Sequence, residues 1–473
     1  MSIVVSILKY NELKRPRLKA SRMLKRLRYL PFFGKNGILI PIRRTQNESR
    51  LLTGGMYMKE LIGACMIGQS GGPTSVINAS ALGCIEAAMQ SPLITKVYGA
   101  AHGIKGVLND KIYDLTLEDP EELALMRYTP ASVLGTCRYK LADWTKDDTD
   151  YKRILEIFRA YDVRYFFYNG GNDSMDTCNK ISNYMASQNY ECRIMGIPKT
   201  IDNDLAMTDH CPGYGSAAKY VATTCMEVCR DAKVYDTGSI TVIEVMGRNA
   251  GWLTASAALA GNGTFGPDLI YLPEVPFELD QFVADVTKVY ESSGDALVVV
   301  SEGIKDKNGV LVSSYFSETS KDKDAFGHSQ MGGLASSLAN FAKAKLNAKV
   351  RGIEFSLLQR CAAHLASSTD VEEAYLAGWT AFEAAASGIT DKMVAFQREA
   401  GKEYRCSTIL VDLSSVANLE KAVPREWINE AGNGMLQPFI DYALPLIQGE
   451  VDRPMVDGLP RFAKLKRVLT RSE

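Results

Sequence analysis

The sequence has few of the features that mark metal, membrane or nucleic-acid-binding proteins. Its four histidines stand in unrelated contexts, and its ten cysteines include no CxxC pair, so no zinc-ligand spacing is present. The net charge is −1, which provides no basic field for nucleic acid or an anionic membrane. No apolar run reaches the length that spans a bilayer. These absences predict a cytoplasmic protein with free cysteines and without nucleic-acid or membrane partners.

Length and charge suggest how the chain is divided. A chain of 473 residues is too long for one core, and its 46% hydrophobic content is typical of a globular protein with two domains. Residues 1–50 hold 13 Lys and Arg against two acids, and the later pattern MYMKELIGACMI is typical of a protein start. We therefore expect residues 1–57 to be a basic N-terminal extension outside the fold. A loosely docked tail or a transit peptide would be the alternatives.

From Met58 onward, short apolar runs alternate with helical patterns. Continuous runs of this kind are typical of strands that are covered on both faces. The expected strands are 61–67, 164–169, 192–197, 239–247, 296–303 and 408–413. The clearest helical patterns are 148–162, 215–232 and 370–388, and the second of these holds Cys225 and Cys229 at a helical spacing that predicts packing. The alternation predicts an α/β fold with mostly parallel sheets, whose ligands gather at the carboxyl ends of the strands.

Two glycine-rich turns follow expected strands. The first is GQSGGPTS, which includes Gly71, and the second is GGNDS at residues 170–174. Bare backbone N–H groups before a helix can bind an anion, although each turn taken alone is most often a plain turn. Asp173 raises a question, because its carboxylate would repel a phosphate at the second turn.

Two further turns carry the charged groups that phosphoryl transfer needs. PKTIDND at 198–204 places Lys199, Asp202 and Asp204 within six positions, so one carboxylate could accept a proton while another helps to hold Mg²⁺. MGR at 246–248 ends a buried strand on Arg248, whose guanidinium could clamp a phosphate. Considered singly, a solvated acidic loop and a structural arginine are the competing interpretations.

As a set, these four turns resemble the phosphofructokinase family, and the resemblance extends from residue 59 to about 460. The segments GTCRYK, VSEG and LLQR fall where that family keeps further site residues. The resemblance implies two similar three-layer domains, interleaved within residues 58–473, with the active site in the cleft between them. It also implies transfer of a phosphoryl group to the 1-hydroxyl of fructose 6-phosphate, in glycolysis and gluconeogenesis.

The family pattern implies a role for each matching residue. The expected catalytic residues are Asp202 as general base, Lys199, Asp173 and Arg248. The expected sugar-phosphate residues are Thr200, Ile201, Asp202, Met246, Gly247, Arg248, Glu302, Arg351, Leu357, Leu358, Gln359 and Arg360. The expected diphosphate residues are Gly71, Arg138, Gly171, Asp173, Ser174 and Lys199. The expected ligands of a Mg²⁺ cofactor are Asn172 and Asp204.

The chain departs from the family pattern at three positions. Leu357 stands where many members carry His or another polar residue, and Ser239 stands where several members contribute an Arg across a subunit boundary. Asn172 replaces an Asp that is associated with the metal, and a neutral ligand holds Mg²⁺ less firmly. Asp204 and the substrate phosphates are therefore expected to carry more of the coordination.

Two positions indicate the phosphoryl donor. ATP users of the family resemble one another in having Gly where Asp173 and Lys199 stand here, which leaves room for the α-phosphate. Asp173 would repel that phosphate by roughly 1 to 4 kcal/mol, depending on the dielectric. Lys199 can neutralise the leaving phosphate of a smaller donor, so pyrophosphate is expected to react, and reversibly. An ATP-dependent enzyme and a noncatalytic regulatory subunit are the alternatives, and the resemblance implies a homodimer or homotetramer.

Overall fold

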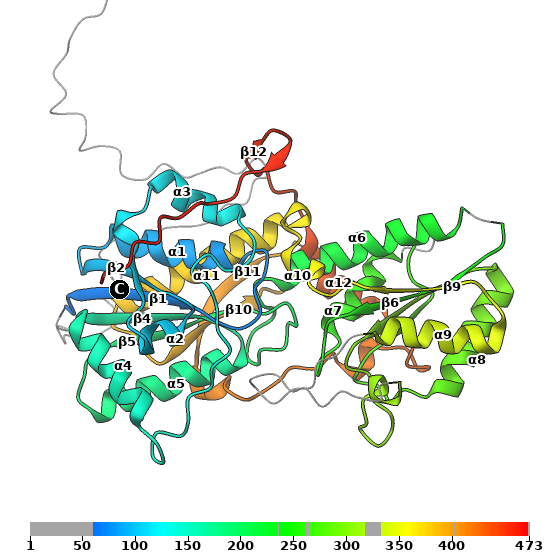
Figure 1. Cartoon of the computed structure of the whole chain (residues 1–473), viewed down its shortest axis with the longest axis horizontal. Coiled ribbons are helices and arrows are strands. Elements are labelled where there is room, and N and C mark those ends of the chain that lie inside the picture. Colours follow the sequence, from blue (N-terminus) through cyan, green and yellow to red (C-terminus); the bar gives the residue numbers. More distant parts are fainter. Residues whose placement is uncertain (1–59, 235, 262–264, 317–332, 402, 472–473) are drawn as a thin grey trace, which may run out of the picture. The chain divides into compact units, whose positions relative to one another are not determined.

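Two separate β-sheets organise the chain (Figure 1). A computed structural model describes residues 60–234, 236–261, 265–316, 333–401 and 403–471. The expected extension at 1–57 and one of the four histidines, His328, lie outside the described residues.

The first sheet has seven strands in the order β11-β10-β5-β4-β1-β2-β3. Its five central strands run parallel, whereas the edge strands β3 and β11 run antiparallel to their neighbours. The strands are β1 Gly63–Gln69, β2 Ile94–Ala100, β3 Ile112–Asp114, β4 Val163–Gly170, β5 Arg193–Pro198, β10 Lys392–Arg398 and β11 Cys406–Asp412.

Helices cover both faces of the first sheet, which explains why its central strands are apolar along their whole length. Helices α1 (Ile77–Gln90) and α11 (Ser368–Ala386) pack on one face. The other face is covered mainly by α2 (Ile104–Leu108), α4 (Thr149–Ala160) and α5 (Asn172–Ser187). A short helix, α3 (Pro120–Ala124), lies in the connection after β3.

Two glycines allow α1 and α11 to approach closely. A Cβ atom on Gly378 of α11 would lie 1.8 Å from the backbone oxygen of Ser80, and one on Gly83 of α1 would lie 2.1 Å from that of Tyr375. Both distances are far below van der Waals contact, so neither position can hold a larger residue without moving the helices apart.

The second sheet has four parallel strands in the order β7-β8-β6-β9. The strands are β6 Ile240–Val245, β7 Leu269–Tyr271, β8 Ala296–Ser301 and β9 Val350–Glu354. One face packs against α6 (Tyr214–Ala232), α7 (Trp252–Ala255) and α12 (Gln437–Ala443), and the other against α8 (Leu279–Ser293) and α9 (Leu334–Leu346). The short α10 (Leu358–Cys361) follows β9.

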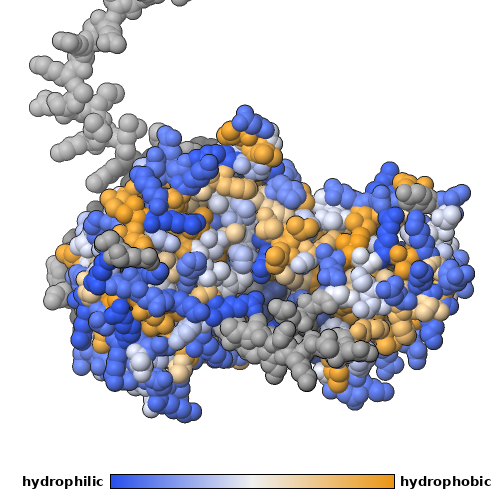
Figure 2. Space-filling view, in the orientation of Figure 1, coloured by the Kyte–Doolittle hydropathy of each residue, from blue (hydrophilic) through white to orange (hydrophobic). Residues whose placement is uncertain are grey.

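The chain returns to the first sheet more than once, since its last described residues also bond to the edge strand β3. After β5 it builds the whole second sheet, returns to add α11, β10 and β11, and then crosses again to place α12 against the second sheet. A small hairpin of β12 (Met455–Val456) and β13 (Leu459–Pro460) follows, and Figure 2 shows its apolar side chains at the surface.

The expected α/β class with mostly parallel strands is confirmed. All six expected strands and all three helical patterns are present within a few residues, and Cys225 and Cys229 are buried in α6. The run 408–413 differs from the expectation, because β11 is a partly buried antiparallel edge strand. Seven strands in the described residues were not predicted: β2, β3, β7, β9, β10, β12 and β13. No helix within the described ranges is long and apolar enough to cross a membrane.

Candidate active site

Three of the expected turns lie side by side because β1, β4 and β5 are neighbours in the first sheet. The backbone N–H of Ser70, after β1, donates to the carbonyl of Asn169 at 2.9 Å. The backbone N–H of Lys199, after β5, donates to the carbonyl of Gly170 at 3.1 Å. The parallel strands therefore bring the SGGP, GGNDS and PKTIDND turns to one edge of the sheet.

The side chain of Lys199 spans two of these turns. Its ammonium is buried and donates to the carbonyl of Gly72 at 2.7 Å. Gly71 has φ of 76°, and a Cβ atom there would come within 3.2 Å of the ammonium nitrogen. Burial lowers the pKa of Lys199 to about 8, although Asp202 and Asp204 oppose the effect. Lys199 thus presents a cation at the glycine turns near neutral pH.

The GGNDS turn starts helix α5 with Gly171 as the residue before the helix. Asp173 lies exposed in the first helical turn, and Ser174 is buried. Both polar atoms of the Asn172 amide are engaged. Its Oδ1 accepts from the N–H of Asn418 at 2.7 Å, and its Nδ2 donates to the carbonyl of Leu419 at 2.5 Å.

The PKTIDND turn is held by backbone contacts on both sides of its carboxylates. Thr200 bridges to Gly213, and its hydroxyl accepts from the N–H of Asp202 at 3.1 Å. Asn203 is fully buried with φ of 54°. Its amide donates to the Tyr442 hydroxyl at 2.7 Å and accepts from the N–H of Cys211 at 2.9 Å. The flanking Asp202 and Asp204 therefore project from a fixed backbone.

Burial raises the pKa of both carboxylates in this turn. For Asp202 the pKa is about 6, because burial and the nearby Glu302 outweigh Lys199, Arg248 and Arg360. For Asp204 the pKa rises to about 7, through burial and then through Asp202. A carboxylate with a pKa near 6 is suited to accept a proton at neutral pH.

The second sheet supplies the MGR turn and the groups beside it. Gly247 has φ of 141°, and its N–H donates to a carboxylate oxygen of Glu302 at 3.4 Å. The N–H of Met246 donates to the Gln359 side chain at 3.2 Å. A Cβ atom on Gly303 would lie 2.0 Å from the carbonyl oxygen of Arg248, so the turns after β6 and β8 touch.

Charges from both sheets act on one another. Asp202 of the first sheet is influenced by Glu302 and Arg248 of the second and by Arg360 of α10. Arg138 in turn acts on Lys199 and Arg360, and Arg360 also lies near Gly72, whose Cβ would be 3.1 Å from its guanidinium. The structure thus gathers seven of the expected residues: Arg138, Lys199, Asp202, Asp204, Arg248, Glu302 and Arg360.

The carboxylates of this group suit a hard divalent cation. Asp202 and Asp204 repel each other, and Glu420 adds to the repulsion at Asp204. A bound cation would relieve that repulsion, and oxygen donors are those that Mg²⁺ prefers. The donor set therefore fits the expected magnesium.

The side chains of three expected site residues, Arg351, Leu357 and Leu358, make no polar contact with the seven gathered residues among the contacts described. Arg351 pairs with Thr241 in the sheet and forms an ion pair with Asp231 at 2.9 Å. Thr241 is five residues before Met246, which at the rise of a strand is roughly 16 Å. Leu357 and Leu358 expose 54% and 59% of their surfaces and offer apolar side chains to solvent.

Glu420 and Asn203 were not identified from the sequence. Glu420 forms an isolated bridge with Leu205, and its side chain accepts from Asn249 at 2.9 Å. The segment NLEKAV around it carries no local signal, because its contacts lie more than 160 positions away along the chain. The N of TIDND could have been suspected, since Asn tolerates a left-handed backbone.

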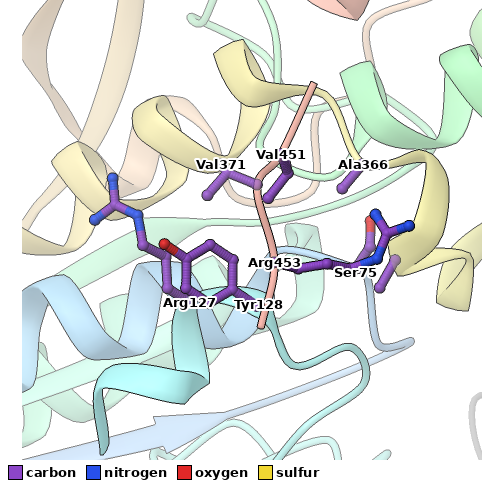
Figure 3. A pocket seen from close by; sticks show the side chains of 8 residues that line it. Ser75, Arg127, Tyr128, Ala366, Val371, Val451 and Arg453 are labelled. Carbon is purple, nitrogen blue, oxygen red and sulfur yellow. The ribbon is translucent and has the colours of Figure 1, made fainter. Parts of the chain in front are cut away.

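Two other places in the described residues gather polar groups but are not suited to bind a substrate or a metal. One is a cavity of about 10 Å³, enough for one water at most, and Figure 3 shows the side chains that line it. It is lined by Ser75, Arg127, Tyr128, Ala363, Ala366, Val371, Val451 and Arg453. Separately, ligand atoms of His210, Glu373 and Cys406 lie within 4.8 Å of one another.

The group around His210 is better described as an ion-pair cluster. The two ring nitrogens lie 2.9 Å from Asp209 and 2.8 Å from Glu373. Burial alone would lower the pKa of His210, but the two carboxylates outweigh it and raise the pKa to about 9. An imidazolium has no lone pair for a metal, so we assign this cluster a structural role.

Comparisons with known proteins agree with the geometry. A family model described as Phosphofructokinase matches residues 64–353. The chain is 44% identical over 403 residues to "Pyrophosphate--fructose 6-phosphate 1-phosphotransferase" of Halomonas elongata, covering 84% of this chain and 95% of that protein. It is 42% identical over 404 residues to the protein of the same name in Methylococcus capsulatus, with 85% and 95% covered. The crystal structure of pyrophosphate-dependent phosphofructokinase from Marinobacter aquaeolei aligns with a TM-score of 0.78 and 40% identity, over 87% of this chain and 98% of that one.

Proposed function

The chain belongs to the phosphofructokinase family, and on that premise we propose that it transfers a phosphoryl group from pyrophosphate to fructose 6-phosphate. The products are fructose 1,6-bisphosphate and phosphate. The observation that carries this proposal is the buried Lys199, whose ammonium lies 2.7 Å from the Gly72 carbonyl of the SGGP turn and whose backbone N–H donates to Gly170 of the GGNDS turn.

Asp202 acts as the general base. Its carboxylate accepts the proton of the sugar 1-hydroxyl as the hydroxyl oxygen bonds to the nearer phosphorus of pyrophosphate. The bond between that phosphorus and the bridging oxygen breaks, and phosphate leaves with the electron pair. In the reverse direction, protonated Asp202 returns the proton to the sugar oxygen.

Cations neutralise the charge that moves in this step. Lys199 faces the leaving phosphate, since its ammonium lies at the glycine turns that bind the donor. We assign Arg138 to the transferred group, and the action of its charge on both Lys199 and Arg360 supports this role. Preorganised cations of this kind are worth more in a buried site than in water, because they need no reorganisation.

The sugar phosphate binds at the turns of the second sheet. Arg248 and Arg360 provide positive charge near Asp202, and Glu302 provides an acceptor for a sugar hydroxyl. Gly247 and Met246 contribute backbone groups to this binding surface. The side chain of Gln359 accepts a hydrogen bond from the N–H of Met246 and so holds that backbone in place. Binding of the 6-phosphate by Arg351 stays a prediction, because in this structure Arg351 forms an ion pair with Asp231.

A Mg²⁺ ion would be held by Asp204 and by oxygens of the donor. Asn172 was the other expected ligand, but both polar atoms of its amide are bonded to the backbone of Asn418 and Leu419. When bound, the ion neutralises phosphate charge and lowers the repulsion between the phosphates and the carboxylates. The chain's own carboxylates supply hard oxygen ligands, and burial followed by the charge of Asp202 raises the pKa of Asp204.

ATP is excluded by the same two residues that admit pyrophosphate. Lys199 occupies the space between the SGGP and GGNDS turns, and Asp173 stands in the first turn of α5. A nucleotide would bring an α-phosphate against that carboxylate. Pyrophosphate has no α-phosphate and therefore does not reach the Asp173 carboxylate.

We place the enzyme in the cytoplasm, as a homodimer or homotetramer. The exposed apolar residues of the β12–β13 hairpin are the surface that we assign to contacts between subunits.

A donor comparison tests the proposal. Purified protein with fructose 6-phosphate and Mg²⁺ should turn over with pyrophosphate, and it should run in reverse with fructose 1,6-bisphosphate and phosphate. ATP should support little or no turnover under the same conditions. Faster turnover with ATP would replace this proposal with the ATP-dependent alternative, and no turnover with either donor would favour a regulatory subunit.

A further inference from the structure

Residues 418–423, which we call the strap, bond to the GGNDS turn, to the PKTIDND turn and to the loop that directly follows MGR. It follows β11 at the edge of the first sheet, and it leads toward α12 on the second (Figure 1). Each sheet fixes its own turns through strand pairing, but no strand is shared between the two sheets. The strap is a piece of chain that bonds to turns from both.

At its first end, the strap binds the GGNDS turn through Asn172. The Asn172 side chain accepts from the N–H of Asn418 at 2.7 Å and donates to the carbonyl of Leu419 at 2.5 Å. An amide can do both at once, whereas a carboxylate can only accept. The position next to Asp173 therefore carries a side chain matched to the strap's backbone.

In its middle, the strap lies against the PKTIDND turn. Glu420 bridges to Leu205, and the N–H of Lys421 donates to the carbonyl of Asp204 at 2.8 Å. The Lys421 ammonium donates to the carbonyls of Thr208 at 3.1 Å and Asp209 at 2.7 Å. These bonds fix the backbone of Asp204 and of the residues that follow it, directly after the general base Asp202.

At its last end, the strap binds the loop that follows MGR. Asn249 donates to Glu420 at 2.9 Å, and the indole N–H of Trp252 donates to the carbonyl of Lys421 at 2.7 Å. Oε1 of Glu274 accepts from the N–H groups of both Gly251 and Val423, at 2.8 and 2.9 Å. The loop after MGR and the strap are thereby joined by two direct hydrogen bonds and by a bridge through Glu274.

We propose that the strap sets the distance between the diphosphate turn, the general base and the sugar turn, and that Asn172 and Asn249 are positioning residues that anchor it. The inference rests on the proposed function for the identity of the groups it positions. Phosphoryl transfer depends on the alignment of donor, base and acceptor, and a shift of about 1 Å can cost on the order of a hundredfold in rate. Asn172 then acts through the strap, and not as a ligand of Mg²⁺.

The variant Asn172→Asp separates the two roles. A carboxylate at this position loses the bond to Leu419 and faces its carbonyl oxygen, so kcat should fall at least tenfold. The KM for fructose 6-phosphate and the Mg²⁺ concentration for half-maximal rate should stay within twofold of the wild type. If kcat is retained and less Mg²⁺ is needed, then Asn172 is a metal ligand and the proposal is overturned.

A double-mutant cycle tests the coupling between the two anchors. Asn172→Ala and Asn249→Ala each release one end of the strap, so the second release should cost less than the first. If the two single effects were independent, their product would give the kcat of the double variant. We expect the measured kcat to be at least fivefold higher than that product. Effects that simply multiply would mean that each residue acts locally, and would overturn the proposal. This cycle also decides the matter if Asn172→Asp does not fold.

Leu419→Ala is the matched control, because Leu419 contributes its carbonyl to the strap and exposes 52% of its surface. Its kcat should remain within twofold of the wild type, and a larger loss would show that side chains of this segment matter independently of its backbone. Wild-type turnover with pyrophosphate is measured first. If it is absent, the proposed function fails, and the cycle is carried out with whichever donor supports turnover.

Discussion

At the scale of single residues, the site pairs one buried ammonium with one partly buried carboxylate whose pKa values approach each other. Burial lowers the pKa of Lys199 to about 8, and burial raises that of Asp202 to about 6. The two groups are therefore charged together only in a window around neutral pH, which is where a base and a cation are both needed.

This window predicts a bell-shaped dependence of kcat/KM on pH. Asp202 must be deprotonated to accept a proton, so activity should be lost as pH falls through about 6. Lys199 must be charged, so activity should be lost as pH rises through about 8. Pyrophosphate also titrates, so Lys199→Arg serves as the control. Its guanidinium stays charged, and an alkaline limb that persists in this variant would belong to another group.

Asp202→Asn should separate binding from chemistry. The amide keeps the shape of the side chain but cannot take the proton of the 1-hydroxyl, so kcat should fall by about two to four powers of ten. Binding of fructose 6-phosphate, measured by calorimetry, should change little. A variant with nearly normal kcat would remove Asp202 from the mechanism.

Donor preference should follow Asp173 and Lys199 jointly. Asp173→Gly alone should admit little ATP, because Lys199 still fills the space beside Gly72. Lys199→Gly alone should sharply reduce turnover with pyrophosphate, since the lost cation acts on the leaving group. The double variant should shift the ratio of kcat/KM for ATP over pyrophosphate more than either single change. An unchanged ratio in the double variant would contradict the assignment of these two residues.

At the scale of secondary structure elements, the contact between α1 and α11 ties together segments that are nearly 300 residues apart. Gly83 and Gly378 lie at the centre of that contact, and each meets a backbone oxygen of the other helix within 2.1 Å of where a Cβ atom would be. Backbone cannot yield as a flexible side chain can, so the helices must separate if either glycine is replaced.

Gly378→Ala should therefore lower stability without altering the chemistry. We expect a loss of about 1 to 3 kcal/mol in the free energy of unfolding, measured by urea denaturation, with kcat unchanged at temperatures where the variant is folded. Gly401→Ala is the control, because a Cβ atom there would come no closer than 3.8 Å to its nearest neighbour. Equal stability of Gly378→Ala and the wild type would mean that the helices adjust freely.

The sequence predicted the position of the site correctly where a charged residue directly follows an apolar run that forms a strand. Lys199, Asp202 and Arg248 follow apolar runs that became β5 and β6, so the parallel-sheet rule placed them correctly at strand ends. Arg351 illustrates the limit of this reasoning. It lies within strand β9, and only the register with Thr241 shows that it sits toward the opposite end from the MGR turn.

Contacts between distant segments were beyond the reach of sequence patterns. Strand β10 is the neighbour of β5, although nearly 200 residues separate them, and the run KMVAFQR was not identified as a strand. The strap is an irregular segment without periodicity, so its bonds to Asn172, Asp204 and Asn249 follow only from the folded arrangement. Motifs in the sequence therefore cannot identify site residues that are held by irregular segments of this kind.

At the scale of the whole molecule, the described contacts of the fold begin close to the first strand. The Tyr165 hydroxyl donates to the carbonyl of Leu61 at 2.6 Å, just before β1 starts at Gly63. A chain begun at Met58 is therefore expected to keep the turnover number and solubility of the full chain. Parallel assays and sedimentation of the two chains test this, and aggregation or lost turnover of the shorter chain would make residues 1–57 part of the enzyme.

The return of the chain to the first sheet has a consequence during synthesis. Helix α1 emerges from the ribosome early, but its apolar surface is covered by α11, which begins at Ser368. At typical elongation rates, synthesis from the end of α1 at Gln90 to the start of α11 at Ser368 takes on the order of tens of seconds. During that time the nascent chain exposes the surface that α11 will cover, and chaperones can bind there. A polypeptide released before Ser368 would keep this surface open, so premature termination should yield fragments that associate with one another instead of a smaller folded domain.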